Sequence, residues 1–111
     1  MSKSNKKLSI IIPVYNEKYT IREIIKRIKL VKNIKKQIIL IDDCSTDGTK
    51  AIIKKELVSK LDNVIFHKKN LGKGAAINSA KKFIKGDFVI IQDADLEYDP
   101  KDYNKILKIL K

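Results

Sequence analysis

Four short apolar runs, each followed by a polar turn and a longer amphipathic segment, constrain the fold more than any other feature of this chain. The runs are LSIIIPVY at 8–15, QIILI at 37–41, NVIFH at 63–67 and FVIIQ at 88–92. Continuous apolar runs of this length are typical of strands that are buried on both faces. Strands that alternate with helices predict an α/β domain, a three-layer sandwich with a parallel sheet at its centre.

The segments between the apolar runs have the spacing of amphipathic helices. Within residues 20–32, the isoleucines and Val31 recur on one helical face, and Thr20 with Glu23 predicts a capping box at the start of the helix. We expect a second helix from about Thr49, a third over AAINSAKKFI, and a fourth that begins at Pro100 with Asp99 as its N-cap.

The length and charge of the chain limit its class. Its 111 residues suffice for one domain, which we expect over residues 8–111 after a basic tail at 1–7. The net charge of +12 comes almost entirely from lysines, because only Arg22 and Arg27 are arginines. Since recognition of bases and phosphates favours arginine, and the lysines are scattered, the charge indicates a solvated surface instead of a nucleic-acid interface.

The chain has no obvious membrane or secretion signal. Its apolar runs fall short of the roughly 20 residues that a membrane-spanning helix needs, and the segment after the basic start does not have the pattern of a signal peptide. The single cysteine, Cys44, excludes an internal disulfide and is compatible with a reducing cytoplasm. We therefore expect a cytoplasmic protein whose basic surface is attracted to phosphate-bearing ligands or to the inner face of the membrane.

The turns that follow the strands form the expected site, because ligands of parallel sheets bind at the carboxyl ends of the strands. The last turn holds four acids, Asp93, Asp95, Glu97 and Asp99. If the backbone stays extended past the fourth strand, Asp93 and Asp95 project to the same side and can face one cation. Carboxylates at this spacing suit Mg²⁺ or Mn²⁺, with Glu97 as a third ligand.

The turn after the second strand carries two adjacent acids. Asp42 and Asp43 repel each other unless a partner binds them, so we expect both to contact a ligand, with Asp43 accepting a hydrogen bond from a base. The residues that follow, Ser45 to Asp47, are expected to cap the next helix.

Other polar residues of these turns have two interpretations. Lys73, between Gly72 and Gly74, lies either at an anion site before a helix or in a plain glycine turn. Glu17 bonds a nucleobase or caps the first helix. His67 has no second ligand residue at motif spacing and is expected at the surface or at the end of a strand, and Cys44 has no expected catalytic role.

Four motifs, in this order and at this spacing, resemble those of family 2 glycosyltransferases. They are IIIPVYNE, ILIDDCSTDGT, NLGKGAAINSA and GDFVIIQDADLEYDP, and together they extend from Leu8 to Tyr103. The similarity is greatest to the dolichyl-phosphate mannose/glucose synthase-like branch. The resemblance implies a GT-A fold, which is a Rossmann-like, nucleotide-binding form of the α/β sandwich.

The resemblance also implies roles for individual residues. The side chains that would contact the nucleotide-sugar are Pro13, Tyr15, Glu17, Asp42, Asp43, Lys73 and Asp93. The side chains that would bind Mg²⁺ or Mn²⁺ on the donor's diphosphate are Asp93, Asp95 and Glu97. Two features depart from the family pattern: Cys44 replaces the glycine of a DDGS motif, and the sequence stops at Lys111, where family members continue for about as long again.

The sequence therefore predicts the donor-binding half of a truncated GT-A domain, with the catalytic base beyond Lys111. The expected reaction of the complete enzyme is inverting transfer of a sugar from a nucleotide diphosphate-sugar, to an acceptor such as a polyprenyl phosphate at the membrane surface, in envelope polysaccharide or glycolipid synthesis. Two alternatives stay open. One is a nucleotide-binding fragment without turnover, and the other is a metal-dependent nucleotidyltransferase, although PVYNEKYT lacks the glycine-rich loop that such an enzyme needs.

Overall fold

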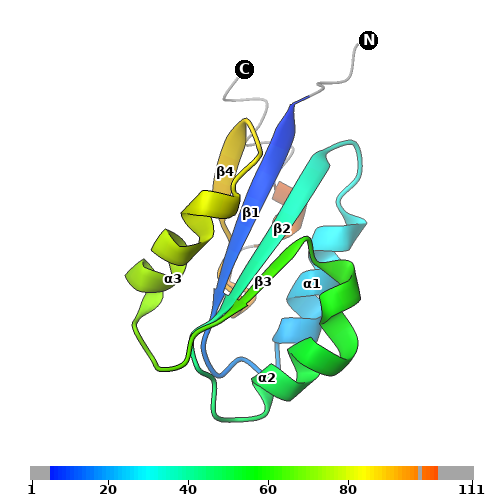
Figure 1. Cartoon of the computed structure of the whole chain (residues 1–111). Helices are drawn as coiled ribbons and strands as arrows, with labels where there is room; N and C mark the ends of the chain where they lie inside the picture. The colour runs from blue at the N-terminus through cyan, green and yellow to red at the C-terminus, as the bar shows by residue number, and fades with distance from the viewer. Residues whose placement is uncertain (1–5, 98, 103–111) are drawn as a thin grey trace.

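A computed structural model describes residues 6–97 and 99–102 of the chain. In this part of the chain a four-stranded parallel sheet has the order β3-β2-β1-β4 (Figure 1). The strands are β1 (Lys7–Val14), β2 (Lys35–Asp42), β3 (Asn63–Phe66) and β4 (Phe88–Ile91). The predicted α/β fold with a parallel sheet is confirmed, and β1 begins one residue before the expected start of the domain.

Helices cover both faces of the sheet, which explains why the strand sequences are apolar at consecutive positions. On one face, alternate residues of β1 and β2 pack against α1 (Ile21–Leu30) and the helical segment after β2. On the other face, Ile11, Ile39 and Ile41 pack against Ala76 and Ala80 of α3 (Lys73–Ala80), which lies on the opposite side of the sheet from α1 (Figure 1). No helix of the described residues is both long enough and apolar enough to cross a bilayer.

The second expected helix changes its winding along its length. It starts as α2 (Thr49–Ile52), continues as a π-helical turn over Ile53–Leu57, and ends as a 3₁₀ turn over Val58–Lys60. Ile53 and Leu57 are both buried against the sheet. The third helix likewise ends in a 3₁₀ turn, Lys81–Phe83.

The predicted start of the fourth helix is confirmed. The carboxylate of Asp99 accepts a hydrogen bond from the N–H of Lys101 at 3.0 Å, and so caps a 3₁₀ turn over Pro100–Asp102. The remainder of that expected helix, residues 103–110, lies outside the described residues.

The capping box predicted for α1 is wrong. The side chain of Thr20 makes no cap hydrogen bond to the helix, because its hydroxyl donates instead to the carboxylate of Glu17 at 2.9 Å. Glu23, the other half of the predicted box, pairs with Arg27 one turn later at 2.8 Å. The N–H groups of Thr20 and Ile21 bond the backbone oxygen of Glu17, so a backbone turn starts the helix.

A proline lies in β1 beyond the point where its pairing with β4 ends. Ile11 accepts a hydrogen bond from Gln92 on the β4 side, and in a strand every second residue faces the same neighbour. Pro13 therefore faces β4, but β4 ends at Ile91, opposite Ile11. The missing N–H costs no ladder bond there. The carboxyl ends of β1 and β4 are also the point where the strand order switches, which is where ligands of open α/β sheets bind.

At the opposite end of the sheet, a buried polar network fixes the connection into β4. The side-chain oxygen of Gln37 accepts bonds from the hydroxyl of Ser9 at 2.7 Å and from the N–H of Lys85 at 2.9 Å. Its amide nitrogen donates to the backbone oxygen of Phe83 at 2.6 Å. Gly86 donates its N–H to the hydroxyl of Ser9 at 2.8 Å, which brings the glycine against β1.

We predict that Gly86→Ala destabilises the fold by about 2–4 kcal/mol, because the new methyl group overpacks a backbone that cannot move away. The added Cβ would lie 2.6 Å from Ser9 Oγ and 2.7 Å from the backbone oxygen of Lys7. Urea unfolding followed by circular dichroism measures the change. The matched control is Gly74→Ala in α3, where a Cβ meets nothing within 4 Å. It should be neutral or slightly stabilising, and equal effects of the two substitutions would contradict this account.

Candidate functional site

A small pocket lies at the carboxyl end of the sheet, between the end of β1 and the start of α3. Its volume is about 160 Å³. The side chains that line it are Pro13, Val14, Tyr15, Glu17, Asp43, Lys73 and Ala76. Five of the seven residues expected to contact a nucleotide-sugar therefore meet in one pocket, although they come from three separate turns. A larger hollow of about 450 Å³, against the C-terminal end of α3, contains none of the expected site residues.

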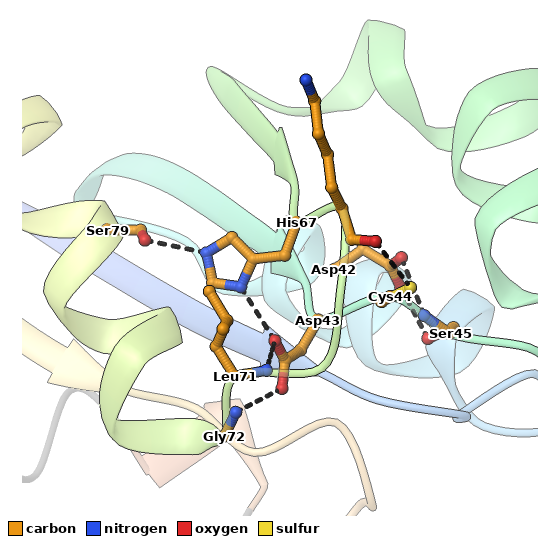
Figure 2. Close-up of polar contacts among 9 residues, drawn as sticks. Asp42, Asp43, Cys44, Ser45, His67, Leu71, Gly72 and Ser79 are labelled. Atoms are coloured by element: carbon orange, nitrogen blue, oxygen red, sulfur yellow. Dashed lines mark hydrogen bonds and ion pairs between the residues drawn. The ribbon is translucent and has the colours of Figure 1, made fainter.

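Asp43 is the most constrained side chain of the pocket. It is 4% exposed, and its carboxylate accepts hydrogen bonds from the N–H groups of Leu71 at 2.9 Å and Gly72 at 2.8 Å (Figure 2). Nδ1 of His67 lies 2.8 Å from the same carboxylate. Burial alone would raise the pKa of Asp43, but the hydrogen bonds from Leu71, His67 and Gly72 outweigh it and hold the pKa below its usual value of 3.8. Asp43 is therefore ionised at neutral pH.

His67 is a residue of the site that the sequence reasoning missed. Its side chain is 8% exposed, and its second ring nitrogen, Nε2, lies 2.8 Å from the hydroxyl of Ser79 on α3 (Figure 2). The strand pairing explains its position, because Asp42 of β2 lies opposite Phe66 of β3, so that Asp43 and His67 leave the sheet side by side. The sequence could not predict this contact of His67 with Asp43, because it depends on β3 lying next to β2 in the sheet.

The side chain of Asp42 is bonded within its own turn and does not line the pocket. Its side chain is fully buried, and its two carboxylate oxygens accept bonds from the hydroxyl of Ser45 at 2.6 Å and the N–H of Ser45 at 3.2 Å. The adjacent acids therefore point to different partners, which removes the repulsion on which the prediction rested. Ser45 does not cap the next helix as expected, whereas Asp47 accepts the N–H of Thr49 at 3.0 Å.

Hydrogen bonds between the first two turns fix the position of Glu17. The N–H of Asn16 donates to the hydroxyl of Ser45 at 2.9 Å, and the side chain of Asn16 accepts the N–H of Thr46 at 2.7 Å. The N–H of Glu17 donates to the hydroxyl of Thr49 at 3.0 Å. The turn PVYNE is thus held against α2, with the Glu17 side chain at the pocket.

An ion pair links a lining residue of the pocket, Lys73, to the turn after β4. Nζ of Lys73, the first residue of α3, lies 2.6 Å from the carboxylate of Asp93, which follows β4. Both side chains are accessible to water, with 56% of Lys73 and 31% of Asp93 exposed. The lysine is therefore at the pocket, as expected, but its partner in this structure is an acid from the predicted metal site.

The structure does not bring the acidic turn together as a three-carboxylate metal site. Within residues 6–97 and 99–102, no group of three His, Cys, Asp or Glu side chains could hold a metal ion. The prediction for Asp93, Asp95 and Glu97 required an extended backbone, but β4 ends at Ile91 and the chain then turns, with Leu96 at a left-handed φ of 68°. The oxygen of Asp95 accepts the N–H of Glu97 at 3.0 Å within this turn.

The acidic turn is nevertheless anchored to the core. Ala94, between the two aspartates, is 3% exposed and packs with the larger apolar cluster. The small side chain therefore faces the core, away from solvent. Asp95 is exposed on the surface.

Cys44 adopts the backbone conformation that a glycine would favour. Its φ is 65°, in the left-handed region, where a side chain costs about 1–2 kcal/mol. Its thiol lies 3.5 Å from the backbone oxygen of Lys68. The loop thus keeps its left-handed turn without the usual glycine.

Comparison with known proteins gives one consistent family. The family model described as "Glycosyl transferase family 2" matches residues 9–111 of this chain. The undecaprenyl-phosphate 4-deoxy-4-formamido-L-arabinose transferase of Aeromonas hydrophila is 35% identical over 93% of this chain and 33% of that protein. The chain therefore spans about a third of the length of the curated relatives it matches.

Solved structures agree with the family. TarS of S. aureus in complex with UDP has a TM-score of 0.78 and 30% identity, over 94% of this chain and 32% of that chain. The mannosyltransferase PcManGT of Pyrobaculum calidifontis, in complex with GDP-Man and Mn²⁺, has a TM-score of 0.77 and 28% identity, over 89% of this chain and 30% of that chain.

We predict that Cys44→Gly is more stable than Cys44→Ala by about 1 kcal/mol, because glycine adopts a φ of 65° without a steric cost. Both substitutions remove the thiol, so the difference between them isolates the backbone conformation. Urea unfolding of the two variants measures it. Equal stability of the glycine and alanine variants would contradict a strained residue at this position.

Proposed function

The chain belongs to glycosyltransferase family 2, and from this membership we propose that it binds a nucleoside diphosphate-sugar for a glycosyl transfer. The observation that carries the proposal is the pocket in which an ionised carboxylate, a lysine at the start of a helix and an exposed aromatic ring come together. The carboxylate can accept a hydrogen bond from a base or a ribose, the lysine can bind a diphosphate, and the aromatic ring can stack on a base. The solved relatives with UDP and with GDP-Man support the same class of ligand.

The nucleobase end of the ligand is proposed to lie at Asp43. A buried carboxylate that is held by three donors keeps its orientation and accepts a hydrogen bond from a base N–H. Tyr15 is 44% exposed at the rim of the pocket, so its ring has a face available to the ligand. Pro13 and Glu17 complete this part of the pocket.

The diphosphate is proposed to lie at Lys73. The lysine is the first residue of α3, so its ammonium group and the N-terminus of the helix both attract anions. A diphosphate competes with Asp93 for the lysine, since that ion pair is accessible to water and costs little to open.

A divalent cation is compatible with this site only with fewer protein ligands than the sequence suggested. Mg²⁺ and Mn²⁺ are often held by one or two carboxylates together with substrate phosphates, so Asp95 on the exposed turn suffices as the protein ligand, with Asp93 and Glu97 beside it. Such a cation would supply neutralisation of the charge on the departing diphosphate. The Mn²⁺ in the structure of PcManGT supports this assignment.

The reaction itself is proposed for the complete enzyme. Relatives that are about three times as long include transferases named for undecaprenyl phosphate, so a polyprenyl phosphate at the membrane surface is the proposed acceptor. The acceptor site, the inversion at the sugar carbon and the catalytic base expected beyond Lys111 stay predictions for that longer protein. The residues described here serve the donor.

We predict that Lys73→Met weakens the binding of UDP by about ten-fold or more, because it removes a cation from the phosphates and leaves the carboxylate of Asp93 nearby. Isothermal titration calorimetry in the presence of Mn²⁺ measures the affinity. Lys69→Met is the matched control, since it removes an exposed lysine of the same loop that does not line the pocket. Equal losses in both variants would mean that only the general positive charge matters.

We predict that Asp95→Asn removes the gain in UDP affinity that Mn²⁺ provides, because the amide is a much weaker ligand of a hard cation. The affinity measured in EDTA should stay at the wild-type value. Glu56→Gln, an exposed acid that pairs with Arg22, serves as the control and should keep the Mn²⁺ dependence. An unchanged Mn²⁺ effect in Asp95→Asn would exclude Asp95 as the ligand.

A further inference from the structure

The hydrogen bonds of Asp43 limit what a base can offer to it. Each oxygen of a carboxylate accepts about two hydrogen bonds. Oδ1 already has two partners among the described residues, the N–H of Leu71 at 2.9 Å and Nδ1 of His67 at 2.8 Å. Oδ2 accepts the N–H of Gly72 at 2.8 Å. Within the described contacts, the carboxylate therefore keeps room for one further donor, at Oδ2.

His67 is held as a donor to this carboxylate. An ionised carboxylate can only accept, so the Nδ1 that lies against Asp43 carries the hydrogen in either charge state of the ring. The other nitrogen, Nε2, is bonded to the hydroxyl of Ser79 on α3 (Figure 2). Because both nitrogens are engaged and the side chain is only 8% exposed, the ring cannot turn away without losing two hydrogen bonds.

The bases of common sugar donors differ in the donors that they present. Uracil and thymine present a single ring N–H, at N3. Guanine presents two parallel donors, N1–H and the 2-amino group, which pair with a carboxylate through both of its oxygens. A carboxylate whose Oδ1 already has two partners can still accept the single N–H of uracil or thymine at Oδ2. It leaves one of the two donors of guanine without a partner.

We propose that the donor of this chain carries a uracil-type base, and that His67 is a positioning residue which excludes guanine by filling the second acceptor oxygen of Asp43. The inference rests on the proposed donor function and on the base lying at Asp43.

The test compares UDP and GDP by isothermal titration calorimetry, with Mn²⁺ present, on the 111-residue chain. Wild-type protein should bind UDP about ten-fold more tightly than GDP or better, since an unpaired donor of guanine weakens binding to that extent. In His67→Phe the ratio should fall, because GDP gains the vacated acceptor position on Oδ1. In His67→Asn, whose amide still donates, the preference for UDP should persist.

Asn78→Ala, an exposed substitution one residue before Ser79, is the control and should leave the ratio unchanged. Circular dichroism establishes that each variant is folded. Equal affinity of wild-type protein for UDP and GDP would overturn the inference while leaving the donor function intact, and so would an unchanged ratio in a folded His67→Phe variant. If the wild-type chain bound neither nucleotide, the proposed function would fail and the inference with it.

Discussion

The carboxylate of Asp43 joins three segments that would otherwise be independent. It follows β2, it accepts two N–H groups of the turn that leads into α3, and it faces the histidine that follows β3. Burying a charge is costly unless donors replace its water. Here the hydrogen-bond donors outweigh burial, and the pKa of Asp43 therefore falls below its usual value. Because the buried carboxylate is stabilised by all three partners, it also fixes the positions of the segments that carry them. These contacts hold one wall of the pocket in place.

In contrast to the buried contacts of Asp43, the ion pair of Lys73 and Asp93 is accessible to water. Its distance is short, but more than half of the lysine side chain is exposed, so solvent screens the attraction and the pair contributes little to stability. The two sides of the pocket therefore differ in how easily they change. The Asp43 side is buried and held by three donors, whereas the ion pair on the Lys73 side is accessible to water and opens at small cost. Under the proposed function, the Asp43 side would hold the base in one orientation, and the Lys73 side would release the diphosphate easily.

The fold was largely predictable from the sequence, because a strand covered on both faces has to be apolar at consecutive positions. That pattern located β1 to β4 to within a few residues, and the motif turns placed Pro13, Tyr15 and Glu17 at the correct edge of the sheet. What failed depended on directions that sequence spacing does not encode. Asp42 and Asp43 are adjacent in sequence but point to different partners, and His67 meets Asp43 only because β3 lies next to β2.

The acidic turn after β4 does not have the extended backbone that the prediction assumed, and it is part of a wider pattern of backbone conformations. A residue with positive φ lies in the turn after each strand of the described sheet: Asn16 at 53°, Cys44 at 65°, Gly72 at 95° and Leu96 at 68°. Only one of these residues is a glycine. Because asparagine tolerates this region, the steric cost of about 1–2 kcal/mol each falls mainly on Cys44 and Leu96. A residue in the left-handed conformation turns the chain within a few positions of the strand end. The polar groups of all four turns therefore stay at the carboxyl end of the sheet. The extended backbone assumed for Asp93 and Asp95 would have carried Glu97 away from that end. The alternation of side chains that holds within β4 does not continue beyond Ile91, because the strand ends there and the chain turns, with Leu96 in the left-handed region.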